Sequence, residues 1–172
     1  MFLNYLKNFF TQKIVKKSIA NVNHIPLNKK IQTVGIVFDE SYFYEKDALV
    51  QELVQKGIQE SDVKVLVFKD KIKKNETFDY PTFCHKDLSW TATFDKSEVK
   101  DFIAQKFDLL INYYDVEKSA LLLVSNQSKA SFKVGFSSVD NKLNHFMIST
   151  NAENYKVFLE ELFKYLKILN KI

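Results

Sequence analysis

The chain has 172 residues, of which 46% are hydrophobic and 15% aromatic, so it is long and apolar enough to fold around a buried core. Its 25 cationic residues are all lysines, and without the planar fork of arginine we expect no sequence-specific DNA recognition. The single cysteine, Cys84, excludes an internal disulfide and a cysteine-rich zinc site. No stretch reaches the roughly 20 apolar residues of a spanning helix, and no signal peptide is recognisable, so we expect a cytoplasmic location.

Charge divides the chain into a basic arm, residues 1–30, and an α/β domain, residues 31–172. The arm holds six lysines and no acidic residue, whereas the remaining 19 lysines and 21 acidic residues leave the domain at −2. Along the arm a short apolar stripe on one side of a helix precedes the basic residues. This order suits docking on a protein or ribonucleoprotein partner, anchoring at the inner membrane surface, or packing on the chain's own domain. The partner-binding candidates, all within residues 1–20, are Phe2, Leu6, Phe9, Phe10, Lys13, Lys16 and Lys17.

The first half of the domain shows alternating strand and helix patterns. Residues 31–38 predict a strand covered on both faces, and residues 45–56 predict a helix that ends at Gly57. Residues 63–68 predict a second strand. The following region, 69–94, keeps no long periodic signal, and we expect only a short strand near 82–84 and a loop through Trp90.

The second half continues the alternation. Its last helix carries the clearest apolar stripe, which includes Leu162 and Phe163, and Thr150 and Glu153 form a capping-box pattern before it. Alternation at this spacing predicts a three-layer, Rossmann-like α/β sandwich with a mainly parallel sheet, plus the N-terminal basic amphipathic helix. The predicted elements of this half are helix 96–105, strand 107–113, helix 116–126, strands 132–136 and 145–148, and helix 151–170.

Three aspartates fall just past predicted strands, and they are the catalytic candidates: Asp39, Asp70 and Asp115. Ligands of parallel α/β sheets bind beyond the carboxyl ends of the strands, so converging carboxylates there could hold Mg²⁺ or act as acid and base. Aspartate is also a favoured loop and N-cap residue, and Asp115 is placed to cap the helix 116–126. Both interpretations stay open.

Other site motifs are weaker. The three glycines form no phosphate-binding loop, which disfavours NAD, FAD and ATP, and we expect no cofactor. Cys84 and His85 are adjacent on an extended segment, so their side chains point to opposite faces and do not readily pair as nucleophile and base. No histidine spacing indicates a metal site. Trp90 either stacks on a ligand or plugs the open end of the sheet core.

A resemblance to known proteins rests on the basic first helix and on four segments: VGIVFD at 34–39, KDLSW at 86–90, FDLLIN at 107–112 and SKASFKVGF at 128–136. Nearly end to end, the chain resembles a family of small bacterial proteins defined only as a domain of unknown function, which implies no activity. Residues 107–136 are also similar to a stretch in the N-terminal half of heptosyltransferase-like glycosyltransferases. There a strand, a helix and a strand ending in Gly-Phe follow in the same order, which implies the fold alone.

These observations favour a non-enzymatic binding or accessory protein whose basic arm contacts a macromolecular partner or a membrane surface. The alternative is a small enzyme, with or without a divalent metal, built on the carboxylate cluster at the C-terminal edge of the sheet.

Overall fold

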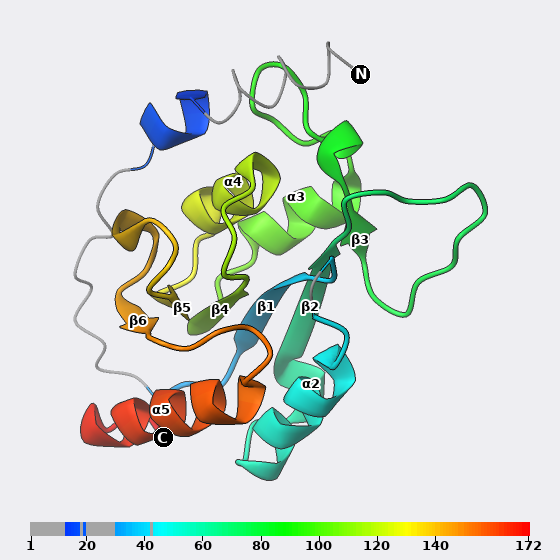
Figure 1. The fold of residues 1–172 in the computed structure, drawn as a ribbon. Coiled ribbons are helices and arrows are strands. Elements are labelled where there is room, and N and C mark those ends of the chain that lie inside the picture. Colours follow the sequence, from blue (N-terminus) through cyan, green and yellow to red (C-terminus); the bar gives the residue numbers. More distant parts are fainter. Residues whose placement is uncertain (1–12, 18, 20–29, 42) are drawn as a thin grey trace.

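Strands and helices alternate along the chain from residue 34 to the end (Figure 1). The computed structural model describes residues 13–17, 19, 30–41 and 43–172. The strands are β1 (Val34–Asp39), β2 (Val63–Phe68), β3 (Thr82–Phe83), β4 (Leu109–Tyr113), β5 (Phe132–Phe136) and β6 (Phe146–Ile148). The helices are α2 (Lys46–Gln55), α3 (Ser97–Ala104), α4 (Ser119–Gln127) and α5 (Tyr155–Ile168), with short 3₁₀ turns η1 (Glu60–Asp62), η2 (His85–Asp87) and η3 (Asn141–Leu143).

The strands form one sheet in the order β3-β2-β1-β4-β5-β6, and every neighbouring pair is parallel. The α/β class and the parallel sheet predicted from the alternation are therefore confirmed. At the centre of the sheet, Val34 of β1 is in register with Val63 of β2 and Leu109 of β4. The first strand begins at Val34 and ends at Asp39, slightly later than the pattern predicts.

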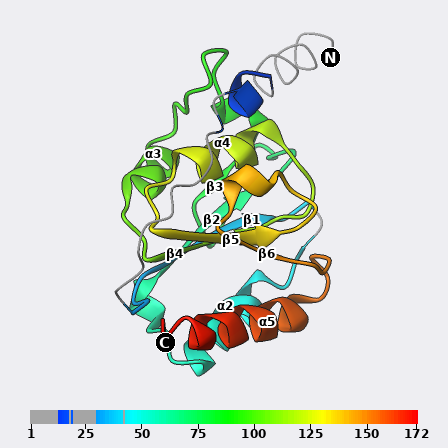
Figure 2. The ribbon, with the colours of Figure 1, turned by 90° about the vertical axis from the view of Figure 1, so that its left-hand side faces the viewer.

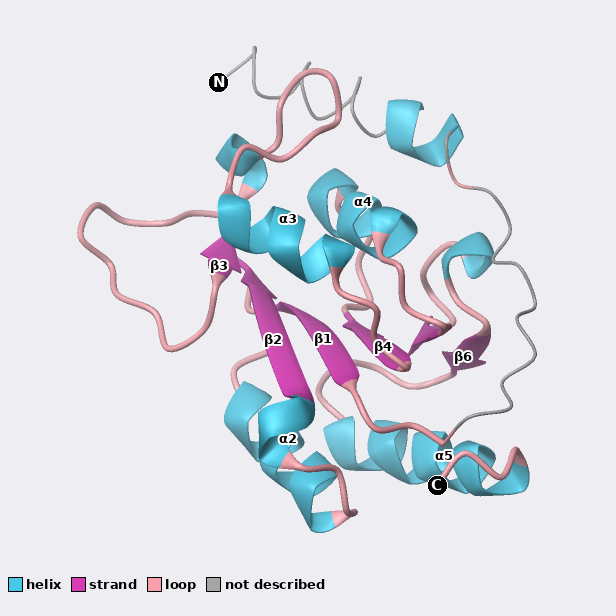
Figure 3. Cartoon of the chain, turned by 180° about the vertical axis from the view of Figure 1, so that it is seen from behind, coloured by secondary structure: helices cyan, strands magenta, loops and turns pink. Residues whose placement is uncertain are grey.

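Helices lie on both sides of the sheet. Figure 2 shows α3 and α4 against one face and α2 and α5 against the other, and Figure 3 shows the same arrangement from behind. The chain leaves β1 toward α2 on one face and leaves β4 toward α4 on the opposite face. The carboxyl ends of β1 and β4, which are neighbours in the sheet, therefore mark the point where the connections diverge, and such points are where α/β sheets bind ligands.

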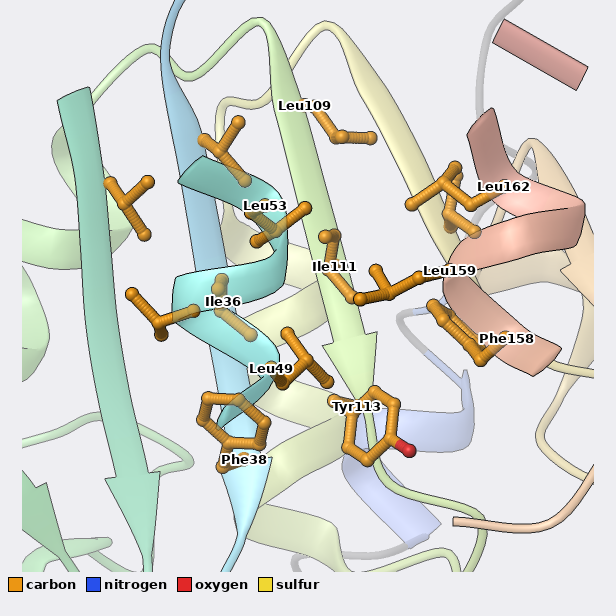
Figure 4. Close-up of a cluster of buried hydrophobic side chains, with 14 of the residues drawn as sticks. Ile36, Phe38, Leu49, Leu53, Leu109, Ile111, Tyr113, Phe158, Leu159 and Leu162 are labelled. Atoms are coloured by element: carbon orange, nitrogen blue, oxygen red, sulfur yellow. The ribbon is translucent and has the colours of Figure 1, made fainter. Parts of the chain in front are cut away.

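The α2/α5 face carries an aromatic core (Figure 4). The ring of Tyr113 contacts Phe38, Phe43, Phe136 and Phe158, with ring centroids 4.7–5.5 Å apart. Its hydroxyl donates to the carbonyl of Ala152, 2.7 Å away, so the one polar atom of this buried ring is satisfied. The apolar stripe predicted for the last helix does face the core, because Leu162 and Phe163 are buried.

The α3/α4 face is also apolar near β1, where Gly35 permits an unusually close contact. A Cβ at Gly35 would lie 2.7 Å from the ring of Phe107, so any larger residue would push this ring off the strand. Buried leucines of α4, including Leu121 and Leu122, complete the layer together with Phe68 and Phe83.

Helix ends follow the sequence only in part. Gly57 has φ of +100°, and the amides of Gly57 and Ile58 donate to the carbonyls of Val54 and Leu53, which confirms the predicted glycine stop after α2. The capping box predicted before the last helix is wrong. α5 follows Asn154, whose side chain makes no capping hydrogen bond, because the turn is closed instead by the amide of Asn154 on the carbonyl of Asn151.

Candidate functional site

The carboxyl ends of β1 and β2 bring two of the three predicted aspartates together around a lysine. Asp39 is the last residue of β1, Asp70 follows β2, and Lys118 directly precedes α4. The Lys118 Nζ atom lies 2.7 Å from Asp39 Oδ2 and 3.0 Å from Asp70 Oδ1. The predicted convergence of carboxylates is real for this pair, but its centre is filled by an ammonium group.

Further contacts fix the position of this ammonium. Lys118 Nζ donates to Ser41 Oγ at 3.0 Å and lies 5.0 Å from the centroid of the Phe68 ring, within cation–π range. The Ser41 amide donates to Asp39 Oδ1 at 3.0 Å, whereas Asp39 Oδ2 makes no hydrogen bond within the described residues and is compensated by the charge of Lys118 alone. Asp39 is 3% exposed, whereas the side chain of Asp70 is 48% exposed, so Asp39 is the inner and Asp70 the outer partner of Lys118.

Asp115 serves another purpose. Its Oδ2 atom accepts from the amide of Ala152 at 3.1 Å, and its carbonyl accepts from Ser138 Oγ at 2.8 Å. The N-cap role predicted for Asp115 is wrong, because α4 begins only at Ser119 and the carboxylate instead ties the loop after β4 to the segment before α5. Asp115 is therefore a structural link between two loops.

Glu40, next to Asp39, also pairs with a lysine. Its carboxylate lies 3.1 Å from Lys46 Nζ, and the nearby Lys69 and Glu76 side chains pair at 2.6 Å. These two pairs line a polar cavity of about 100 Å³ between β2, β3 and α2. A cavity of this size falls below the 300–1,000 Å³ typical of sites for small organic ligands.

This arrangement has a definite chemical consequence. The Lys118 Nζ atom, 2.7 Å from Asp39 Oδ2 and 3.0 Å from Asp70 Oδ1, fills the space between the two carboxylates in which Mg²⁺ would bind. Within the described residues, no three His, Cys, Asp or Glu side chains are grouped as metal ligands.

Cys84 and His85 do not form a nucleophile–base pair. Cys84 is buried, and burial raises the pKa of its thiol, which disfavours the reactive thiolate. The imidazole of His85 packs edge-on against Phe68, with centroids 4.9 Å apart. The amide of Cys84 donates to Asp87 Oδ2 at 2.8 Å, so the pair belongs to the turn that follows β3.

Part of the basic arm packs on the domain. Residues 13–17 are helical, and Val15 and Ile19 are buried in the same cluster as α3 and α4. Lys16 Nζ lies 2.7 Å from Glu117 Oε2, while Lys13 and Lys17 are exposed. The remaining arm candidates, Phe2, Leu6, Phe9 and Phe10, lie outside the described residues.

Trp90 lies at the tip of a small closed loop. The loop is drawn together by an antiparallel bridge between Leu88 and Phe94 and by hydrogen bonds among the hydroxyls of Ser89, Thr91 and Thr93. The plug interpretation is wrong, because Trp90 is 52% exposed, whereas Leu88 and Phe94 are buried and fill the core instead. Stacking on a ligand stays a prediction.

Sequence reasoning missed a buried polar network between β4, β5 and α4. Ser125 Oγ donates to Asn112 Oδ1 and is hydrogen-bonded to the hydroxyl of Tyr114, and Asn112 Nδ2 donates to Asn144 Oδ1. Lys133 is 6% exposed, and its Nζ atom donates to the carbonyl of Ser125 at 2.7 Å. A lysine and an asparagine inside apolar strand runs are the only sequence signals that could have indicated this network.

Comparisons with known proteins give a family and no function. No described helix is both long and apolar enough to cross a membrane. No curated protein and no solved structure matches the chain. The model of a family of unknown function, DUF6913, matches residues 7–169. Because this match covers nearly the whole sequence, the chain belongs to the DUF6913 family.

Proposed function

We propose that this protein is a non-enzymatic binding or accessory protein of the cytoplasm, whose basic arm contacts a macromolecular partner or a membrane surface. The observation that best supports the proposal is the position of Lys118 between Asp39 and Asp70. This ion pair occupies the place where an α/β sheet normally receives a substrate or cofactor. With that place taken by the protein's own side chains, the exposed cations of the arm become the most suitable contact group.

The attachment of the arm supports the same proposal. Val15 and Ile19 hold it on the α3/α4 face, and Lys16 pairs with Glu117, which stands directly before Lys118. Lys13 and Lys17 remain exposed on the same helical segment. A short helix fixed at one side and cationic at the other presents its charges in a set orientation, which favours attraction of phosphate groups.

The strand order supports a Rossmann-like interpretation of the fold. The order 3-2-1-4-5-6 is that of doubly wound dinucleotide-binding sheets, which bind phosphate through a glycine-rich turn after the first strand. Here the turn after β1 reads Glu40-Ser-Tyr-Phe-Tyr-Glu45 and contains no glycine. The architecture is therefore compatible with that fold, while the phosphate-binding turn has been replaced by Ser41 and the ion pair. The enzyme alternative requires Lys118 to leave both carboxylates first, and it is the less favoured hypothesis.

A salt-dependent binding assay tests the proposal. The intact protein is sedimented with vesicles containing anionic phospholipid and, separately, incubated with ribosomal RNA, each over a range of salt concentrations. We expect binding to one of these, weakened by Lys13→Glu with Lys17→Glu, because each lysine lost removes a contact to phosphate. Lys164→Glu with Lys167→Glu on α5 is the matched control, since it changes the net charge equally on another face. Equal losses in both variants, or no binding to either probe, would contradict the proposal.

The apolar part of the arm is tested by a second pair of variants. We expect Phe9→Glu with Phe10→Glu to disrupt the protein more than Lys16→Glu with Lys17→Glu. Replacing two aromatic side chains by glutamates removes apolar surface that would be buried, whether the arm packs on the domain or enters a membrane interface. A larger effect of the lysine pair, in co-sedimentation and in thermal melting, would indicate a purely electrostatic contact.

A further inference from the structure

The outer edge of β2 is covered by β3 over only part of its length. β2 starts at Val63, but β3 pairs with it only at Val67 and Phe68 (Figure 3). The shortness of β3 has a chemical cause, because Pro81 directly precedes it and has no N–H to donate to a neighbouring strand. The first half of β2, from Val63 to Val65, therefore borders no strand on this side within the described sheet.

The backbone of β2 directs hydrogen-bonding groups to this open edge. The amide of Val67 donates to the carbonyl of Pro81, and the amide of Lys69 donates to the carbonyl of Phe83, each at 2.9 Å. Because peptide groups alternate along a strand, the N–H and C=O of Val65 and the C=O of Val63 point to the same side. The amide of Val63 is already used, since it donates to the carbonyl of Glu60.

A groove of about 360 Å³ runs along this open edge. Tyr80 and Pro81 form one wall, and Phe102 of α3 forms the other, with Val63 and Val65 at the strand. The wall at Tyr80 is fixed, because its hydroxyl donates to Asp47 Oδ1 of α2 at 2.9 Å. Val63 and Val65 are largely buried, and the groove is a preformed, partly apolar channel beside the N–H and C=O of Val65, which have no strand partner on this side among the described residues.

The lining of the groove carries more negative than positive charge. Glu98 and Asp101, one turn apart on α3, supply two carboxylates, and Lys64 supplies one ammonium, so the lining carries a net charge of −1. The outer edge of β3, by contrast, is blocked, because Lys96 Nζ donates to the carbonyl of Thr82. Lysines at strand edges protect proteins against unwanted pairing. The half-edge of β2 carries one lysine, Lys64, but the carboxylates of Glu98 and Asp101 outweigh its charge, so this edge is acidic.

We propose that this half-edge of β2 binds an extended peptide segment of a partner protein, which adds a short strand in line with β3. The backbone groups of Val63 and Val65 select an extended main chain, and the groove accepts aliphatic side chains. Residues of the added strand alternate between the two faces, so those on the α3 side meet Glu98 and Asp101 and are lysine or arginine. A second copy of this chain fits poorly, because a twofold pairing would bring two grooves of the same negative charge together.

Peptide titration of the intact, ¹⁵N-labelled protein tests this proposal. The probe is acetyl-Val-Lys-Val-Lys-Val-amide, and the control is acetyl-Val-Glu-Val-Glu-Val-amide. We expect the lysine probe to shift the amide signals of Val63, Val65 and Phe102 saturably, and the acidic probe to bind about tenfold more weakly or worse. A lysine probe with N-methylated backbone amides should lose this binding, since it cannot pair as a strand.

Charge variants test whether the peptide binds in this groove. Glu98→Lys with Asp101→Lys should reverse the preference between the two probes, whereas Glu160→Lys with Glu161→Lys on α5, the same change in net charge, should leave it unchanged. Thermal melting confirms that each variant is folded. Equal binding of both probes, shifts that map to another surface, or no saturable shift would overturn the proposal. A peptide-independent dimer that shifts Val65 with protein concentration would overturn it in favour of a second copy.

Discussion

Lys118 lies at the N-terminal end of α4, and the side chain of Lys133 contacts the C-terminal end of the same helix. The two ammonium groups have different partners. Lys118 Nζ lies within 3.0 Å of two carboxylates, those of Asp39 and Asp70. Lys133 Nζ is buried and donates to a last-turn carbonyl of the helix, that of Ser125. The carboxylates suit the positive end of the helix dipole, and the ammonium of Lys133 suits the negative end.

The difference shows how a buried cation behaves with and without an opposite charge. Burial lowers the pKa of Lys133 from 10.5 to about 8, because it removes the hydration of the charge, and the hydrogen bond to a carbonyl at the helix end replaces that hydration only in part. Lys118 is held by two full negative charges. The N-terminal end of α4 is therefore a closed ion pair, and the C-terminal end is a cation whose charge state depends on pH.

Removing the charge of Lys118, which is paired with two carboxylates, should have the largest effect on stability. Lys118→Met leaves Asp39 buried without its ammonium partner, and we expect a loss of about 3–5 kcal/mol in the free energy of unfolding, measured by urea titration. Lys118→Met combined with Asp39→Asn should recover part of this loss, because the uncompensated charge is gone. A loss under about 1 kcal/mol in the single variant would show that Asp39 does not depend on Lys118.

Removing the charge of Lys133, which has a carbonyl rather than a carboxylate as its partner, should stabilise the protein. Lys133→Met replaces a buried ammonium by an apolar side chain of similar length, and we expect it to raise the free energy of unfolding at pH 7 by about 1–3 kcal/mol. Chemical denaturation of both proteins measures the change. Destabilisation by Lys133→Met would mean that the hydrogen bond to Ser125 outweighs the cost of burying the charge.

The pH dependence should separate the two ends of α4. As pH rises through 8, folded Lys133 releases its proton, while the unfolded chain keeps its own until about 10.5. The unfolded state then binds more protons, so the free energy of unfolding should rise between pH 8 and 9, by at most about 1.4 kcal/mol per pH unit. Lys133→Met should lose this rise. The series stops at pH 9, because burial raises the pKa of the Cys84 thiol above its ordinary value of 9.0, and Cys84 therefore contributes with the opposite sign above that pH.

The exposed ion pair of the arm should matter least. Lys16 and Glu117 are 2.7 Å apart, but the Lys16 side chain is 47% exposed, so Glu117→Gln should change stability by less than about 1 kcal/mol. Val15→Ala, which removes buried apolar surface from the same segment, should cost more. Thermal melting of the two variants gives the order, and a larger effect of Glu117→Gln would place the arm's attachment in the ion pair.

The sequence predicted what depends on local pattern. Apolar runs located the strands, and the placement of Asp39 and Asp70 after strands predicted that these carboxylates meet. The contact of Lys118 with these aspartates was not predicted, because in the sequence a lysine before a helix cannot be distinguished from a solvent-exposed one. Only the parallel arrangement of β1, β2 and β4 brings its ammonium to both aspartates. The role of Asp115 was misread for the same reason, since its partner is the amide of Ala152, far along the chain.

A Mg²⁺ titration tests most directly whether Lys118 occupies the space between Asp39 and Asp70 at the carboxyl ends of the strands. Calorimetry of the intact protein, with amide signals of Asp39 and Asp70 followed by NMR, is compared with the same titration of Asp39→Asn. We expect no saturable heat and no saturable shift at these residues in either protein. Saturable Mg²⁺ binding by the native chain that Asp39→Asn abolishes would contradict it and favour the enzyme alternative.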